Sequence, residues 1–235
     1  MRPRTLLSLV VPLLAAAFFA RLGIWQLSRH GERADVNAAL AERLSLPPVQ
    51  FDSLTPDTLA SRWRRVSISG RFRYDLEQIH AGRTSEGSPG VYLLTPLERE
   101  GSDTLVLITR GWVYSADAAA ADIAHWRERD TVSLDGYVLP LPSTGTAPAE
   151  GRPFRTLNAS ALNARIGHPV SPLRIVMTSD SAARADSVPR RLPPPVVDAG
   201  PHKSYAIQWF AFALIALTGG VLLFRRGVVA DRAGR

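Results

Sequence analysis

The chain has 235 residues, a formal net charge of +7 and no cysteine. The lack of cysteine excludes disulfides, thiolate nucleophiles, iron–sulfur ligation and cysteine-based metal sites. The arginines are scattered through predicted strands, turns and tails rather than gathered in one block, so we expect no nucleic-acid partner despite the positive charge.

Both ends of the chain carry long apolar segments. Residues 5–20 are uncharged and apolar, the apolar character continues through residues 22–25, and residues 204–224 form a second run. About 20 apolar residues are enough to cross a hydrocarbon core of about 30 Å. We therefore predict a membrane protein in which two transmembrane helices flank a β-rich α+β periplasmic domain. The predicted parts are a helix at 5–27, the domain at 29–200, a helix at 203–224 and a cytoplasmic tail at 225–235.

The orientation of these helices depends on the first of them. A cleavable signal peptide is an alternative interpretation, because Arg2 and Arg4 precede the apolar core and alanines 15–17 resemble a cleavage site. The apolar stretch runs on to Leu27, however, which favours an uncleaved signal anchor. A long domain can be translocated largely regardless of its charge. We therefore expect a multi-pass protein of a bacterial inner membrane, with both termini cytoplasmic and the central domain periplasmic.

The central segment alternates apolar and polar residues, which indicates strands with one buried face. We expect strands over 63–74, 91–97, 104–113, 131–139 and 172–177, with 76–80 continuing the first of them after a bend. Residues 83–90 are predicted to form a Gly/Ser/Pro turn, and residues 98–103 a hairpin turn. Pro96 is expected at the end or on the edge of its strand, because proline cannot donate a hydrogen bond to a sheet.

Two short helices and two irregular segments complete the predicted domain. Capping residues, glycine and proline mark their boundaries. We expect a helix over 115–129 capped by Ser115, a loop over 141–152, a helix over 160–166 capped by Ser160 and ended at Gly167, and a stiff extended link over 192–196.

Signatures of catalysis and of metal binding are not visible in the chain. It has no glycine-rich phosphate loop, no GxSxG elbow and no HExxH motif. Its five histidines, at positions 30, 80, 125, 168 and 202, are dispersed, and none pairs with another at metal-ligand spacing. We therefore expect a protein that is not an enzyme. A membrane-tethered periplasmic hydrolase is the least favoured alternative, because no nucleophile–base constellation is visible.

Polar and aromatic residues gather where the two predicted membrane helices reach the periplasm. On the second helix, four residues at i, i+3, i+4 and i+7 share one face: His202, Tyr205, Ala206 and Trp209. The first helix carries two sets on neighbouring faces: Arg21, Trp25 and Arg29, which repeat every four residues, and Leu22 with Gln26. The predicted topology places all of them at the same membrane surface.

These residues allow two interpretations. The first is an aromatic belt with snorkelling Arg and His side chains, as at the ends of many membrane helices. The second is a binding site for a large apolar ligand with anionic edges, such as haem. An imidazole can ligate haem iron, arginine can pair with propionates, and aromatic faces can cover the macrocycle. Gln26 favours the second interpretation, because polar groups near a span usually have a partner.

Four segments resemble signatures of the surfeit-locus-protein-one family, whose members are assembly factors for cytochrome c oxidase. In family order they are LGIWQLSR at 22–29, GVYLLTPL at 90–97, VLITRGWV at 106–113 and HKSYAIQWF at 202–210. The third segment departs from the family pattern at Thr109, which replaces the usual Asn, and the next residue after the segment, Tyr114, replaces the usual Pro. Residues 154–167 keep only a trace of an aromatic-rich family segment.

The resemblance implies an inner-membrane chaperone of respiratory-chain biogenesis that assists insertion of haem a into oxidase subunit I. It implies His202 as the candidate ligand of the haem iron. Its expected partners are subunit I, the assembly machinery and membrane lipid. The alternative is a scaffold that stabilises subunit I and binds no haem. The predicted residues that bind haem a are His202, Arg21, Arg29, Trp25, Gln26, Tyr205 and Trp209.

The triplet Arg110-Gly111-Trp112 is the predicted partner contact of the central domain. A structural role is the competing interpretation. In that case Gly111 permits a β-bulge, Trp112 lies in the core and Arg110 is solvated.

Overall fold

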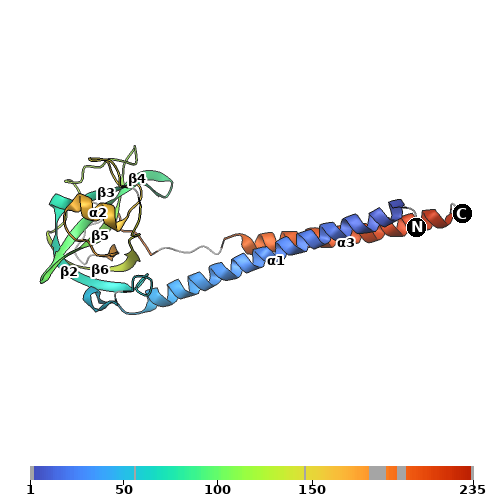
Figure 1. Cartoon of the computed structure of the whole chain (residues 1–235), viewed down its shortest axis with the longest axis horizontal. Helices are drawn as coiled ribbons and strands as arrows, with labels where there is room; N and C mark the ends of the chain where they lie inside the picture. The colour runs from blue at the N-terminus through green and yellow to red at the C-terminus, as the bar shows by residue number, and fades with distance from the viewer. Residues whose placement is uncertain (1–2, 56, 146, 180–188, 195–199, 234–235) are drawn as a thin grey trace. The chain divides into compact units, whose positions relative to one another are not determined.

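The computed structural model describes residues 3–55, 57–145, 147–179, 189–194 and 200–233 (Figure 1). The chain forms two compact units. One unit contains Met1–Leu40 together with Val196–Arg235, and the other contains Ala41–Pro195. The first unit is a helical hairpin, and the second is a β-barrel domain.

Two long helices form the hairpin, α1 over Pro3–Ser45 and α3 over His202–Ala233. By length and composition, both are long and apolar enough to cross a membrane. They run antiparallel and side by side, with the start of α1 and the end of α3 at the same end of the hairpin (Figure 1). The Phe19 ring joins them, because its centroid lies 5.7 Å from that of Trp209 and 5.8 Å from that of Phe212.

The residues at the contact between α1 and α3 alternate three- and four-residue spacings, as in antiparallel knobs-into-holes packing. On α1 they are Ala16, Phe19, Gly23 and Gln26, and on α3 they are His202, Ala206, Trp209 and Ala213. Half of these residues are Ala or Gly, which lets the two backbones approach. The predicted end of the first apolar span at residue 27 is not the end of the helix, since α1 continues to Ser45. As membrane boundaries, positions 27 and 203 stay predictions.

The barrel domain is built from five strands that close on themselves. Their order is β2 (Arg65–Phe72), β6 (Thr131–Pro140), β7 (Leu173–Ser179), β5 (Ser102–Tyr114) and β4 (Ser88–Arg99). The ring closes where β4 also pairs with β2, at Phe72↔Leu97. Only β5 and β7 are parallel neighbours within this ring. Strand β1 (Val49–Gln50) extends β2, and β3 (Gln78–Ser85) extends β4.

The barrel interior holds the largest apolar core. It is lined by alternate residues of all five strands, among them Val66, Ile68, Leu97, Val106, Ile108, Leu134, Val138, Ile175 and Met177. A second apolar cluster covers the outside of β4 and β5, where the short helix α2 (Ala159–Ile166) packs through Leu162 and Ile166. Burial of these faces explains the period-two alternation that marks the strands in the sequence.

The five predicted strands are confirmed, with boundaries that differ by no more than three residues. The predicted hairpin over 98–103 is confirmed as well, because Arg99 pairs with Ser102. Pro96 lies inside β4, at the point where β4 changes its partner from β3 to β2. The continuation of the first strand over 76–80 is wrong: this segment begins β3, which turns back to pair with β4.

The predicted helix over 115–129 is also wrong, since this segment consists of turns, bends and irregular backbone. The Asp117 carboxylate accepts hydrogen bonds from the backbone N–H groups of Ala119 and Ala120, and Ala118 has a left-handed φ of 51°. Side chain–backbone bonds of this kind compete with helix formation. The Trp126 carbonyl accepts a 2.6 Å hydrogen bond from Arg110, which holds the segment against the barrel. Tertiary contacts thus override the helix propensity of the alanine run.

The second predicted helix is confirmed as α2, with Gly167 as its left-handed C-cap. Its N-cap is Asn158 rather than Ser160, because the Asn158 side chain accepts a hydrogen bond from the Ala161 N–H. The loop 141–152 contains no strand or helix in its described residues. The predicted extended link at 192–196 lies partly outside the described residues.

Candidate functional site in the helical hairpin

A single polar contact joins His202 and Gln26 inside the hairpin. His202 is the first residue of α3, and its Nδ1 lies 2.8 Å from the Oε1 of Gln26 on α1. With the amide oxygen facing the ring, this hydrogen bond requires a proton on Nδ1, which Nδ1 donates. In the neutral ring of this tautomer, Nε2 carries the lone pair. An imidazole held in this way can ligate a metal through its open nitrogen.

The aromatic residues of the predicted site have two different surroundings. Trp209 is half-buried and stacks on Phe19 with an interplanar angle of 21°. Trp25 is 53% exposed and Tyr205 is 46% exposed. His202, Ala206 and Trp209 therefore share the face that meets α1, whereas the rings of Trp25 and Tyr205 are available to a ligand or to lipid.

The two predicted arginines of α1 also differ. Both side chains are exposed, but Arg29 forms a 2.6 Å ion pair with Glu32 on the same helix. Arg21 has no ion pair within the described residues. Among the described residues, Arg21 therefore has no carboxylate partner that competes with an anionic group, whereas Arg29 has Glu32.

Sequence reasoning did not find Phe19 and Gly23 as supports of this site. The Phe210 ring lies over Gly23, with ring atoms 2.8 Å from the position that a Cβ would take. The signal was present in the three- and four-residue spacing that relates Phe19 and Gly23 to Gln26. These contacts hold the register in which Gln26 meets His202.

The predicted partner triplet lies at the barrel, where Arg110 is fully buried. Its guanidinium pairs with Glu77 and with Glu128, the latter at 2.8 Å, and it donates a 2.8 Å hydrogen bond to Thr95. Burial alone would lower the pKa of Arg110, but the charges of its carboxylate partners and their hydrogen bonds outweigh it and raise that pKa. The interpretation of Arg110 as a solvated side chain is therefore wrong.

Gly111 and Trp112 join β5 to residues 189–191, which we call the clip segment. Trp112 and Arg190 exchange two backbone hydrogen bonds of 2.8 Å each. Gly111 permits this approach, since a Cβ there would lie 2.5 Å from the Arg190 carbonyl oxygen. The β4–β5 register shifts next to Gly111, as a bulge requires. Trp112 is half-buried, and its role in partner contact stays a prediction.

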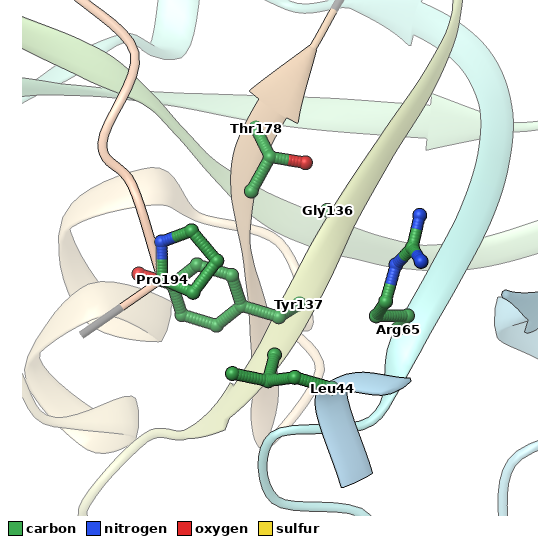
Figure 2. Close-up of a pocket in the computed structure, with 6 residues that line it drawn as sticks. All are labelled: Leu44, Arg65, Gly136, Tyr137, Thr178 and Pro194. Carbon is green, nitrogen blue, oxygen red and sulfur yellow. The ribbon is translucent and has the colours of Figure 1, made fainter. Parts of the chain in front are cut away.

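The barrel carries a small pocket between the end of α1 and strands β2, β6 and β7 (Figure 2). Its volume is about 220 Å³, and its lining residues are Leu44, Arg65, Gly136, Tyr137, Thr178 and Pro194. Ligand and cofactor sites usually have volumes of roughly 300–1,000 Å³. The pocket is therefore too small for a macrocycle. Nor do the described residues contain a cluster of His, Asp and Glu that could hold a metal ion.

His80 is a buried histidine of the barrel whose pKa is lowered by its surroundings. It is 6% exposed, and burial, followed by the charges of Arg83 and Arg174, lowers its pKa from 6.5 to about 4. In the unfolded chain His80 takes up a proton near pH 6.5, whereas in the folded chain its imidazole stays neutral until about pH 4. The contribution of His80 to the free energy of unfolding is thus fully present above about pH 6.5. As the pH falls toward 4, this contribution is lost, which lowers the free energy of unfolding by roughly 3 kcal/mol.

We expect His80→Asn to remove this part of the pH dependence. The measurement is urea unfolding of the full chain in detergent, followed by near-ultraviolet circular dichroism between pH 4 and 7. The matched control is His168→Asn, because His168 is exposed. An acid-induced loss of stability that is equal in His80→Asn and His168→Asn would exclude the buried histidine as its source.

The protein thus combines a small closed β-barrel with a hairpin of two apolar helices, and His202 lies at the contact between these helices. The chain belongs to the SURF1 (surfeit locus protein one) family, whose model matches residues 13–214. This match includes the hairpin contact between Gln26 and His202 as well as the barrel.

Individual relatives are similar over most of the chain. A SURF1-like protein of Mycobacterium tuberculosis is 27% identical over 222 residues, which cover 91% of this chain and 80% of the relative. A SURF1-like protein of Rickettsia felis is 24% identical over 229 residues, which cover 94% and 98%. The cytochrome oxidase assembly protein SHY1 of Saccharomyces cerevisiae is 33% identical over 103 residues, which cover 43% of this chain and 26% of the yeast protein.

Proposed function

We propose that this protein is a non-enzymatic assembly factor for cytochrome c oxidase that assists insertion of haem a into subunit I. Membership of the SURF1 family and the similarity to a yeast protein named for oxidase assembly support this proposal. In this proposal α1 and α3 cross a bacterial inner membrane, both termini are cytoplasmic, and the barrel is periplasmic. Haem a is the cargo that the hairpin holds before delivery.

The contact between His202 and Gln26 is the observation that carries the proposal. It leaves Nε2 of His202 open, as an axial ligand of haem iron requires. Arg21 is the preferred partner of a haem propionate, because Arg29 already pairs with Glu32. The exposed rings of Trp25 and Tyr205 can contact the macrocycle. The Trp209 ring is held in place by stacking on Phe19 and lines one side of the proposed site.

The proposal is tested in a bacterium that makes haem a but lacks its own family member. Expression of the wild-type chain is expected to restore haem a in subunit I of the purified oxidase. His202→Ala is expected to restore far less, whereas Lys203→Ala, a change at the next and exposed position, is expected to act as the wild type. Full restoration of haem a by His202→Ala would exclude the ligand role.

A second candidate function is a scaffold that holds the helices of subunit I and binds no haem. The outer faces of the hairpin favour it, because they expose large apolar side chains such as Ile207, Leu214 and Ile215. These side chains suit contact with lipid or with the helices of a partner. This candidate predicts a colourless protein that still captures subunit I, and it predicts no effect of His202→Ala on that capture.

A further inference from the structure

We infer that Gln26 is the positioning residue of His202: it sets the tautomer and the orientation of the imidazole and does not itself contact the cargo. The inference rests on the proposed function, because it concerns the same site. It differs from the sequence-based prediction, which placed Gln26 among the residues that bind haem a.

The surroundings of Gln26 explain why its amide needs a protein partner. Gln26 lies on the α1 face that meets α3, where Gly23 and Phe19 precede it and pack against Phe210 and Trp209. Gln26 is partly buried, and loss of water from an amide without a replacing partner costs at most roughly 1–3 kcal/mol in proteins. The His202 ring satisfies the amide oxygen at 2.8 Å. An amide engaged in this way is not directed toward a ligand on the outer surface of the hairpin.

The same hydrogen bond has a consequence for the ring. Donation from Nδ1 to a carbonyl-type oxygen keeps the proton on Nδ1 and the lone pair on Nε2. It also fixes the rotation of the ring about its bond to Cβ. Histidines that ligate metals usually have such an outer partner, and loss of the partner weakens metal binding by about 10- to 100-fold. Gln26 supplies this partner from the opposite helix.

A different result is expected if the hydrogen bond of Gln26 only stabilises the contact between α1 and α3. In that case, loss of the hydrogen bond would weaken the hairpin but would not change the tautomer of the His202 ring. Positioning requires that the tautomer and the affinity for haem change together while the hairpin stays intact. Gln26→Met separates these roles, because methionine has a similar length and is compatible with an apolar helix contact.

The first measurement uses the full chain in detergent micelles without haem. Nitrogen-15 NMR of the His202 ring, at a pH where the ring is neutral, is expected to show the Nδ1-protonated form in the wild type. Gln26→Met is expected to lose this preference, and Ser28→Ala, a change at an exposed position of the same helix, is expected to keep it. A wild-type ring that is protonated on Nε2, or a tautomer that Gln26→Met leaves unchanged, would overturn the inference.

The second measurement is the affinity of the same proteins for extracted haem a, followed by the Soret absorbance. Gln26→Met is expected to bind about 10- to 100-fold more weakly than the wild type and Ser28→Ala. Unchanged affinity in Gln26→Met would contradict the inference. A wild type that binds no haem a would instead overturn the proposed function, while the tautomer measurement would still decide the role of Gln26. Stacking of Trp209 on Phe19, followed by tryptophan fluorescence, reports whether each variant retains the hairpin.

Discussion

Arg110→Ala is expected to lower the free energy of unfolding of the barrel by about 3–5 kcal/mol, because removal of one partner from a buried ion pair leaves an uncompensated charge. In this barrel the change removes an ion-pair partner from two carboxylates, Glu77 and Glu128. Glu77 is fully buried, and Glu128 is 5% exposed. Arg191 also pairs with Glu128 and so compensates one of the two charges. Glu77 has no second cationic partner within the described residues.

This loss of stability can be measured by thiol labelling, because the chain has no cysteine and an introduced cysteine is therefore its only thiol. A single Val138→Cys change places a thiol at a fully buried position of β6. The rate of thiol labelling in the full chain then reports the free energy with which the barrel opens. Arg73→Ala is the matched control, since Arg73 pairs with an exposed Asp75 and such pairs contribute about 0–1 kcal/mol. Equal labelling rates for Arg110→Ala and Arg73→Ala would contradict the structural role of the buried network.

Gly111→Ala is expected to detach the clip segment from β5. A Cβ at this position would lie 2.5 Å from the Arg190 carbonyl oxygen and 2.9 Å from its carbon, so the backbone must move. The change removes two backbone hydrogen bonds between Trp112 and Arg190 and strains the pairing of Arg191 with Glu128. At about 1 kcal/mol for each neutral bond and more for the charged contact, we expect a loss of roughly 2–4 kcal/mol.

Hydrogen exchange followed by mass spectrometry measures this effect within the full chain. Peptides that contain Trp112 and Arg190 are expected to exchange faster in Gly111→Ala, and β2 is expected to change less. The matched control is Gly31→Ala, because a Cβ at Gly31 has no neighbour within 4 Å. Unaltered protection of the Trp112 amide in Gly111→Ala would show that attachment of the clip segment does not require a glycine at position 111.

The strands could be predicted because their alternation is a local signal. Closure of the barrel could not, since it depends on pairs that are distant in the sequence, such as Phe72↔Leu97 and Ile108↔Ile175. The predicted helix at 115–129 failed for the same reason, because its alanines favour a helix locally while Arg110 holds the Trp126 carbonyl. Local propensity is a weak guide where a tertiary contact competes with it.

The candidate site was predictable to a similar degree. Helical spacing grouped His202, Tyr205, Ala206 and Trp209 on one face, and the structure turns three of them toward α1 but leaves Tyr205 46% exposed. The polar Gln26 does have a hydrogen-bond partner, whereas the binding roles of these residues stay predictions. The identity of that partner could not be read from the sequence, since it lies on the other helix. The burial of Arg110 was missed because Glu77 and Glu128 reach it from elsewhere in the fold. A charged residue within a strand does not reveal its partners.

The absorbance spectrum of the full chain, purified from cells that make haem a, tests the central claim most directly. We expect a haem a spectrum for the wild type and its loss or marked change for His202→Ala, with Lys203→Ala unchanged. A colourless wild type from such cells, or a His202→Ala variant with full haem and an unaltered spectrum, would contradict the claim that this hairpin holds haem a through His202.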